Sequence, residues 1–222
     1  VVLGTPDKML AASCPAGPAF EGGEITFGMP GYEGAIEKVD FYKNDFTYQT
    51  IGDAKPLGLC GSGLIDFLSV LVKKNLMNPL GKFESEKESI YIDKNESINL
   101  SRRDVSSLAQ AKAANVCGQA LVIKDFGTNI EEIENIYLAG GFANFIDIQN
   151  AKEIGFNLNF PIERIKKIGN SALEGATKLL LSNKLRKNLV DYVTKIDHLE
   201  LETKPEFFDY FVEGCQFKKI SI

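Results

Sequence analysis

The chain has 222 residues, 44% of them hydrophobic, and a formal net charge of −5 at pH 7. This length allows a substantial core in one large domain or two small ones. The acidic balance argues against nucleic acid or an anionic membrane as the main partner. No apolar run reaches the ~20 residues of a membrane span, so we expect a cytoplasmic protein with neither nucleic-acid nor membrane partners.

The cysteines are far apart in the sequence and form no Cys-x-x-Cys pair; they are Cys14, Cys60, Cys117 and Cys215. With His198 as the single histidine, this spacing excludes a metal site of the usual local type and predicts reduced thiols. The chain begins on Val1-Val2-Leu3-Gly4, which has the composition of the middle of a strand. We therefore expect a fragment of a longer protein.

The first 51 residues predict β-structure. Short runs rich in β-branched or aromatic residues alternate with Gly, Pro, Asn and Asp at 8–14, 25–29, 35–42 and 46–51, and Asn44-Asp45 favours a hairpin turn. The segment 12–23 is too rich in glycine and proline for a strand and predicts a loop with one helical turn. A ligand-binding loop, with Ser13, Glu21 or backbone amides as contacts, and a plain crossover are equally compatible with it.

An apolar run from Pro56 ends in glycines at Gly61 and Gly63, and a buried, almost wholly apolar helix is predicted over 64–77 with Ser62 as its cap. A helix start beside glycines suits an anion such as phosphate. However, no lysine follows Gly63 as in a phosphate loop. Cys60 lies in an apolar setting, so we interpret it as a buried thiol rather than a nucleophile.

The middle of the chain predicts short strands at 89–92 and 98–100, followed by a long helix. Ser101 and Asp104 have the spacing of a capping box that opens a helix of about 25 residues to Phe126. Gly127 then suits a C-cap and Thr128 or Asn129 the next N-cap. Although Asp-Phe-Gly-Thr-Asn at 125–129 resembles the phosphate loop of actin-type ATPases, it follows a helix, so capping is the preferred interpretation. The alanines of this helix allow another element to pack close; they are Ala109, Ala111, Ala113, Ala114 and Ala120.

A second apolar run, 136–138, predicts a strand buried on both faces that ends on Gly140 and Gly141. In open α/β sheets, ligands bind beyond the carboxyl ends of the strands, and glycine lets a ligand approach the backbone. This edge is therefore a candidate ligand site, with a plain strand-to-helix turn as the alternative.

A helix at 148–154 and a strand at 162–168 follow, and the strand ends on Gly169-Asn170. Ser171 and Glu174 predict a second capping box for a helix over 171–182. Gly175 inside that helix indicates close approach of another backbone or a ligand. The remainder predicts a helix at 185–194, a strand at 198–201 and a helix at 205–215, with His198 as an ordinary edge histidine.

Five segments, in this order, resemble the C-terminal ATPase domain of the reductive activators of corrinoid proteins. They are 12–22, 59–66, 111–114, 137–142 and 168–176. These activators are large iron–sulfur proteins whose nucleotide domain belongs to the superfamily of acetate kinase, sugar kinases, heat-shock chaperones and actin. The resemblance covers essentially the whole chain. It implies an α/β fold, namely a ribonuclease H-like or actin-like lobe with a mixed sheet flanked by helices. Residues 1–222 would form a single domain that is the distal part of a two-lobed ATPase domain. Within it we expect a β-rich front at 1–58 and an α/β part at 59–222.

The resemblance also implies a function. In such proteins an amino-terminal 2Fe–2S domain supplies an electron, and ATP hydrolysis helps drive reduction of a Co(II) corrinoid protein to Co(I). Carried over, 139–142 corresponds to the adenosine motif, Gly169-Asn170 with Gly175 to the second wall of the nucleotide cleft, and 13–23 and 61–63 to family loops. The candidate nucleotide-binding residues are Ser13, Glu21, Gly61, Ser62, Gly63, Ala139, Gly140, Gly141, Phe142, Asn144, Gly169, Asn170 and Gly175.

The family's two phosphate loops and its cluster domain lie upstream of the segment equivalent to Val1. We assign no catalytic residue or metal ligand here, and expect this chain alone to bind ATP and Mg²⁺ weakly or not at all, without hydrolysis. A corrinoid protein is the expected partner, and a homodimer is possible. Two alternatives stay open: a sugar or acyl-group kinase of the same superfamily, or a non-catalytic docking or dimerisation module that uses the β-rich front and the terminal helix.

Overall fold

The computed structural model of the chain describes residues 1–93, 95 and 97–222. Its strands are β1 (Val2–Gly4), β2 (Met9–Ala11), β3 (Ala35–Tyr42), β4 (Asp45–Thr50), β5 (Gly58–Leu59), β6 (Ser89–Tyr91), β7 (Asn99–Ser101), β8 (Ile136–Ala139), β9 (Ile165–Gly169) and β10 (Ile196–His198). Its α-helices are α1 (Gly61–Lys73), α2 (Arg102–Phe126), α3 (Gly141–Phe145), α4 (Ile148–Glu153), α5 (Ser171–Leu181), α6 (Asn183–Val193) and α7 (Phe207–Gly214). The described strands form small sheets, ordered β1-β2-β10, β4-β3-β5, β6-β7 and β8-β9.

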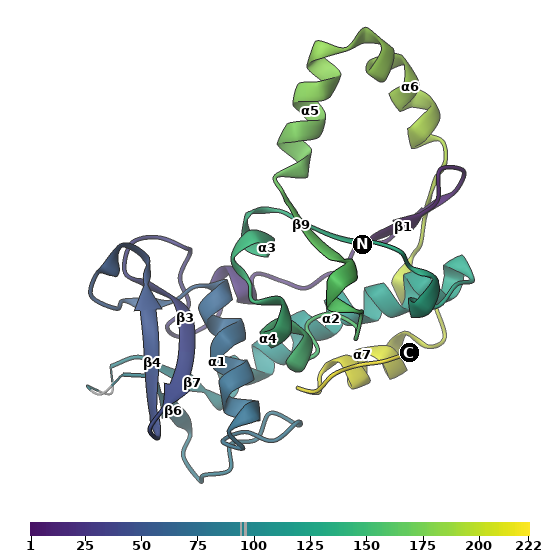
Figure 1. Cartoon of the computed structure of the whole chain (residues 1–222). Helices are drawn as coiled ribbons and strands as arrows, with labels where there is room; N and C mark the ends of the chain where they lie inside the picture. Colours follow the sequence, from purple (N-terminus) through teal and green to yellow (C-terminus); the bar gives the residue numbers. More distant parts are fainter. Residues whose placement is uncertain (94, 96) are drawn as a thin grey trace.

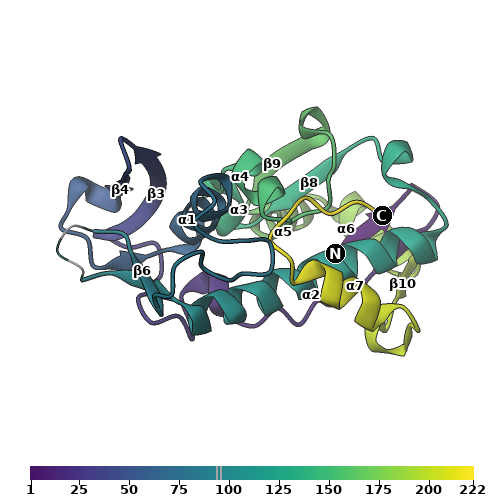
Figure 2. The same cartoon turned by 90° about the horizontal axis from the view of Figure 1, so that it is seen from below.

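Helix α2 is the longest element; α7 packs along it, and α1 with the β3–β4 hairpin lies toward its N-terminal end (Figures 1 and 2). The predicted capping box is confirmed: the Asp104 amide donates to Ser101 Oγ at 3.2 Å, and the Ser101 amide donates to Asp104 Oδ2 at 2.9 Å. The predicted end is confirmed too, because Gly127 takes a left-handed φ of 82°. A Cβ on Gly214 of α7 would lie 2.9 Å from Ala113 Cα, so the small residues of α2 do admit a closely packed helix.

Helix α1 is the centre of the main hydrophobic core and is buried from Gly61 to Leu71. The predicted cap at Ser62 is wrong. The helix begins at Gly61 with Cys60 as its N-cap, and no side chain of the described residues caps it. The local reason is that Ser62 is already inside the first turn, where its hydroxyl lies 3.4 Å from Cys60 Sγ. Gly63 lets β3 cross the helix closely, since a Cβ there would clash with the Ile36 carbonyl.

Several β predictions hold with shifted bounds. Strands β3 and β4 form the expected hairpin, whose turn lies at Lys43 and Asn44, both with positive φ. The strands expected at 89–92 and 98–100 are present as β6 and β7, and the structure pairs them antiparallel. The strand predicted at 198–201 lies instead at β10, Ile196–His198. The segment 12–23 does contain one turn of 3₁₀ helix, Ala19–Glu21.

Other predictions are corrected by local backbone chemistry. The run 25–29 is not a strand, because the chain turns there: the Gly28 amide bonds to the Ile25 carbonyl at 3.0 Å. The strand predicted from 162 starts only at Ile165, because a 3₁₀ turn follows Pro161. Helix α5 is capped by Asn170, whose side chain accepts from the Leu173 amide at 3.0 Å, so the second capping box is wrong.

Strand β8 is not covered on both faces as predicted. Tyr137 is 57% exposed and the burial pattern alternates along the strand. The strand pairs in parallel with β9 alone among the described strands. One face of this pair packs on the body and the other is open in this chain.

Helices α5 and α6 project from the body as an arm (Figure 1). No residue of either helix is buried. The helices predicted at 171–182 and 185–194 are thus present, but their apolar side chains have no core to enter. Among the described residues, no helix combines the length and apolar character needed to cross a membrane.

Candidate functional site

The carboxyl ends of β8 and β9 form one corner of the molecule. Ala139 is the register partner of Gly169, and the Gly140 amide donates to the Gly169 carbonyl at 2.8 Å. Helix α3 starts directly after β8, and α5 starts after Asn170. The glycine-terminated strands predicted from sequence therefore end side by side on the same rim.

The backbone of this corner is open. A Cβ added at Gly140 or Gly141 would meet no heavy atom within 4 Å, and one at Gly169 would meet only Asn144 Nδ2 at 3.7 Å. The predicted residue Gly175 lies inside α5 of the arm and also has no neighbour within 4 Å of an added Cβ. Gly140 and Gly169 have φ of 105° and 66°, which accounts for glycine there. Gly141 and Gly175 have neither positive φ nor a close neighbour in this chain. The space beside them is free for a group outside the chain.

A pocket of about 370 Å³ lies beside the corner, between α3, the start of α1 and the 3₁₀ turn of the first loop. It contains predicted residues from three distant segments: Glu21, Gly61, Ser62, Gly141 and Phe142. Because Gly61 has no side chain, the ring of Phe142 can lie against it. Phe156 holds that ring in an edge contact with centroids 5.9 Å apart.

The pocket wall is mainly apolar. Its large side chains include Phe20, Met29, Ile51, Phe142 and Phe145, and its charged side chains are the carboxylates of Glu21 and Glu37. No lysine or arginine of the described residues lines it. Such a wall suits a flat, uncharged group that stacks on aromatic rings, and it repels phosphate.

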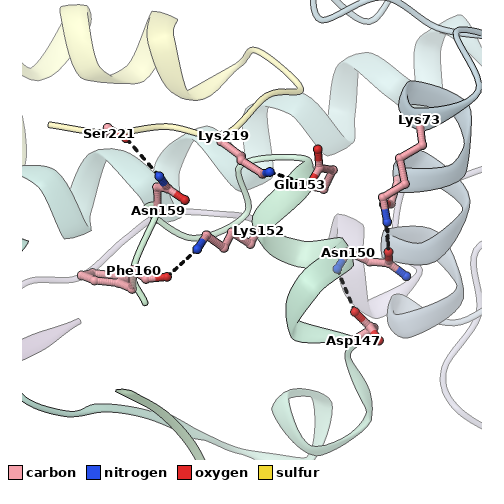
Figure 3. A network of polar contacts seen from close by, with 10 residues as sticks. Lys73, Asp147, Asn150, Lys152, Glu153, Asn159, Phe160, Lys219 and Ser221 are labelled. Carbon is pink, nitrogen blue, oxygen red and sulfur yellow. Dashed lines mark hydrogen bonds and ion pairs between the residues drawn. The ribbon is translucent and has the colours of Figure 1, made fainter. Parts of the chain in front are cut away.

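A polar network joins α4 to α1, and Figure 3 shows part of it. Asn150 of α4 donates to Asp66 Oδ1 at 2.7 Å, and its own Oδ1 accepts from Lys73 Nζ at 2.6 Å and Ser69 Oγ at 3.0 Å. Burial raises the pKa of Asp66, while the bonds from Asn150 and from the Val39 amide oppose that rise. The network therefore holds α4 against α1.

The far side of α4 is tied down as well. Figure 3 shows Lys152 Nζ bonded to the Phe160 carbonyl at 2.8 Å and Lys219 paired with Glu153 at 3.1 Å. On β9, Lys167 Nζ donates to the carbonyls of Asn144 and Ile146 at 3.1 and 2.6 Å. The short helices α3 and α4 are therefore held by side chains from several elements around them.

Two of the predicted nucleotide-binding residues, Ser13 and Gly63, do not line the pocket. Ser13 is exposed and does not line the pocket, and its neighbour Cys14 packs on Gly118 of α2. Gly63 is buried against Ile36, so helix–strand packing accounts for it. Cys60 is buried with its thiol donating to the Ile36 carbonyl at 3.4 Å, which confirms the structural interpretation.

Sequence reasoning missed other residues of the site. Met29, Glu37, Ile51 and Phe145 line the pocket, but no local motif marks them. Asp66 could have been found, since it is a carboxylate in an otherwise apolar helix and needs a partner when buried. No group of three or more His, Cys, Asp or Glu within residues 1–93, 95 and 97–222 is arranged to hold a metal ion.

Comparisons with known proteins agree on one family. The family model described as the C-terminal domain of RACo, the ASKHA domain, matches residues 1–222. The corrinoid activation enzyme RamQ of Eubacterium limosum is 32% identical over 242 aligned positions, which cover 98% of this chain and 41% of RamQ. A reductase of the Co(II) methylated amine-specific corrinoid protein from Methanosarcina barkeri is 25% identical, over 93% of this chain and 42% of that protein.

A solved structure is also similar. A reductive activator for a corrinoid, iron–sulfur protein superposes with a TM-score of 0.86 at 33% identity, over 97% of this chain and 37% of that one. These matches confirm the actin-like fold expected from the sequence. The chain spans about two fifths of the length of the curated relatives it matches.

Proposed function

The chain belongs to the family of C-terminal ASKHA domains of RACo-type proteins, and from this premise we propose that it is the nucleotide-binding portion of an ATP-dependent reductive activator. The longer protein would return Co(II) corrinoid proteins to Co(I). The names of the relatives support this proposal, since each refers to activation or reduction of a corrinoid protein.

The main structural support is that the open glycine corner adjoins the aromatic pocket. Gly141 and Phe142 line the pocket and directly follow Gly140, whose amide bonds to Gly169. We assign the adenine ring to the aromatic pocket, where it would stack on phenylalanine. The ribose and the first phosphate would lie along the open backbone at Gly140, Gly169 and Asn170, away from the carboxylates of Glu21 and Glu37.

The rest of the mechanism belongs to residues outside this chain. ATP and Mg²⁺ would be gripped by phosphate loops in the preceding part, and a 2Fe–2S domain there would deliver the electron. We propose that residues 1–222 are the distal part of that ATPase domain, and that this part alone binds ATP weakly and does not hydrolyse it. Four free cysteines agree with a cytoplasmic location, and a homodimer of the longer protein belongs to the same proposal.

Gly141 offers a direct test in the longer protein. A Cβ there would have no atom of this chain within 4 Å, and a valine side chain would occupy the space assigned to the nucleotide. We expect Gly141→Val to weaken ATP·Mg²⁺ binding at least tenfold by calorimetry without lowering the melting temperature of the nucleotide-free protein. The control is Ser106→Val on the exposed face of α2, which should leave binding unchanged. Equal affinity in both variants would overturn the site.

The reaction is tested by the absorption spectrum of a corrinoid protein. With an electron donor present, ATP should convert its Co(II) form to Co(I) in the wild type and much more slowly in Gly141→Val. Transfer of phosphate to a sugar or carboxylic acid instead would identify a kinase of the same superfamily. Tight ATP binding and turnover by residues 1–222 alone would contradict the assignment of the phosphate grip to the preceding part.

A further inference from the structure

A β-bulge carries Glu37, a half-buried residue in the wall of the aromatic pocket. Ile36 pairs with Thr50 and Lys38 pairs with Gln49, so Glu37 is an extra residue of β3 without a register partner on β4. A bulge bends its strand and turns the side chain away from its regular direction, and bulges are common next to active sites. Here the extra residue is one that reaches the pocket.

The carboxylate of Glu37 has no hydrogen-bond or ion-pair partner among the described residues. No described lysine or arginine lines the pocket, and the other carboxylate in its wall belongs to Glu21, which is exposed. A charged group that is partly removed from water without a partner costs free energy. A ligand that donates a hydrogen bond to Glu37 would offset this cost.

The first turn of α1 lies beside Glu37. A Cβ on Gly63 would be 3.5 Å from the Glu37 nitrogen, and Gly61 and Ser62 of the same turn line the pocket. The first amides of a helix have no partner within that helix, and no described side chain caps this one. Neighbouring positions of the pocket wall can therefore supply hydrogen-bond donors and an acceptor.

We propose that Glu37 selects the base of the nucleotide by accepting a hydrogen bond from the 6-amino group of adenine. This assignment rests on the proposed function, which places the adenine ring in the aromatic pocket. The amino group of adenine is a donor next to acceptor nitrogens of the ring, and an ionised carboxylate can only accept. The first amides of α1 suit a ring nitrogen. A base with a carbonyl group at position 6 would present a second acceptor to the carboxylate and bind more weakly.

Nucleotides that differ in one group test this assignment in the longer protein. Purine riboside triphosphate lacks the 6-amino group, and inosine triphosphate has a carbonyl group in its place. In calorimetry with Mg²⁺, the wild type should bind ATP about tenfold or more tightly than either. Glu37→Met removes the acceptor, so it should bind ATP and purine riboside triphosphate equally. The control is Glu86→Met, at an exposed position outside the pocket, which should keep the wild-type ratio.

Glu37→Gln is the conservative variant. Its side-chain amide keeps an acceptor oxygen for the amino group of ATP and adds a donor for the carbonyl group of inosine triphosphate. It should therefore bind ATP nearly as well as the wild type, and inosine triphosphate about tenfold more tightly than the wild type does. A merely structural role of Glu37 would instead weaken all three nucleotides together in both variants, and that result would overturn the proposal.

The outcomes separate this assignment from the proposed function. A wild-type preference for ATP that persists in Glu37→Met would overturn the role of Glu37, while the nucleotide site would stand if Gly141→Val weakens binding. Tighter binding of GTP than of ATP by the wild type would also overturn the assignment, because the carboxylate would then accept from guanine. Absence of binding by the wild type for all of these nucleotides would overturn the proposed function together with this inference.

Discussion

The region around α1 and the arm formed by α5 and α6 use similar residues in opposite environments. Leu68 of α1 is completely buried, whereas Leu181 at the end of α5 is 81% exposed. Burial of apolar area drives folding at about 25 cal/mol per Å². The α1 region therefore carries stability, and the arm depends mostly on its own helix propensity and caps. The apolar side chains of a helix do not by themselves reveal whether its partner is in the same chain.

Truncation of one leucine in each region should give the largest difference. We expect Leu68→Ala to lower the free energy of unfolding by about 2–5 kcal/mol, because it leaves a cavity in a packed core. Leu181→Ala should change it by less than about 0.5 kcal/mol. Urea unfolding followed by circular dichroism measures both. A similar cost for the two would mean that the arm packs against something in this chain.

Lys112 gives the next largest effect, because it is a charged group inside the body. It is fully buried, and its Nζ donates to the carbonyls of Gly214, Gln216 (2.6 Å) and Gly155 (3.5 Å). Lys112→Met keeps the volume but leaves these carbonyls without a donor, so we expect a loss of roughly 2–3 kcal/mol in urea unfolding. Lys187→Met on the exposed arm is the control. An equal loss of unfolding free energy there would mean that burial does not determine the effect.

The same lysine predicts a pH dependence. Burial lowers the pKa of Lys112 to about 7 from an ordinary value of 10.5. Between these values the unfolded chain binds more protons than the folded one, so the stability due to this group rises with pH. The difference in unfolding free energy between wild type and Lys112→Met should therefore be larger at pH 9 than at pH 7. A constant difference would mean that the three carbonyls hold the ammonium as well as water does.

Replacing a glycine by alanine should have opposite effects in the two regions, destabilising the α1 region and favouring the helix of the arm. Gly63→Ala puts a methyl group against the Ile36 carbonyl, so we expect a loss of about 1–3 kcal/mol from overpacking. Gly175→Ala meets nothing within 4 Å in the middle of α5. It should instead raise the helicity of the arm, since alanine is favoured over glycine by ~1 kcal/mol in a helix. Far-UV circular dichroism with urea unfolding separates the two outcomes, and a helicity loss in Gly175→Ala would contradict an open arm.

Local signals predicted the elements well where the deciding groups are neighbours in sequence. The bounds of α2 followed from Ser101, Asp104 and Gly127, because capping is settled within one helical turn. The β8–β9 corner followed from glycines directly after apolar runs. The β8–β9 corner is also the part of the candidate site that the sequence could indicate.

Long-range packing could not be read in the same way. Asn150 and Asp66 are bonded across the body, and Phe145 reaches the pocket through the position of α3. Periodicity in the sequence predicts which face of a helix is apolar, but it does not predict which other element packs on that face. The wrong cap at Ser171 has a local cause instead. Asn170 and Ser171 are both good caps, and the end of β9 at Gly169 decided between them.

The smallest effects are expected at the helix caps. The caps of the two regions are chemically alike, but only α2 is packed against the core and should unfold together with it. Ser101 caps α2 beside the core, and Asp104 of the same box also accepts from the Thr26 amide at 2.9 Å. Ser101→Ala should lower the free energy of unfolding by about 1 kcal/mol. Asn170→Ala removes the cap of an exposed helix with no buried residue.

The effect of Asn170→Ala should therefore be local. Amide exchange in α5 should become faster while the urea midpoint of the whole chain stays unchanged, because unfolding of the arm exposes little area that the core had buried. A midpoint shift as large as that of Ser101→Ala would mean that arm and core unfold together. The apolar face of the arm would then contribute to the stability of this chain on its own.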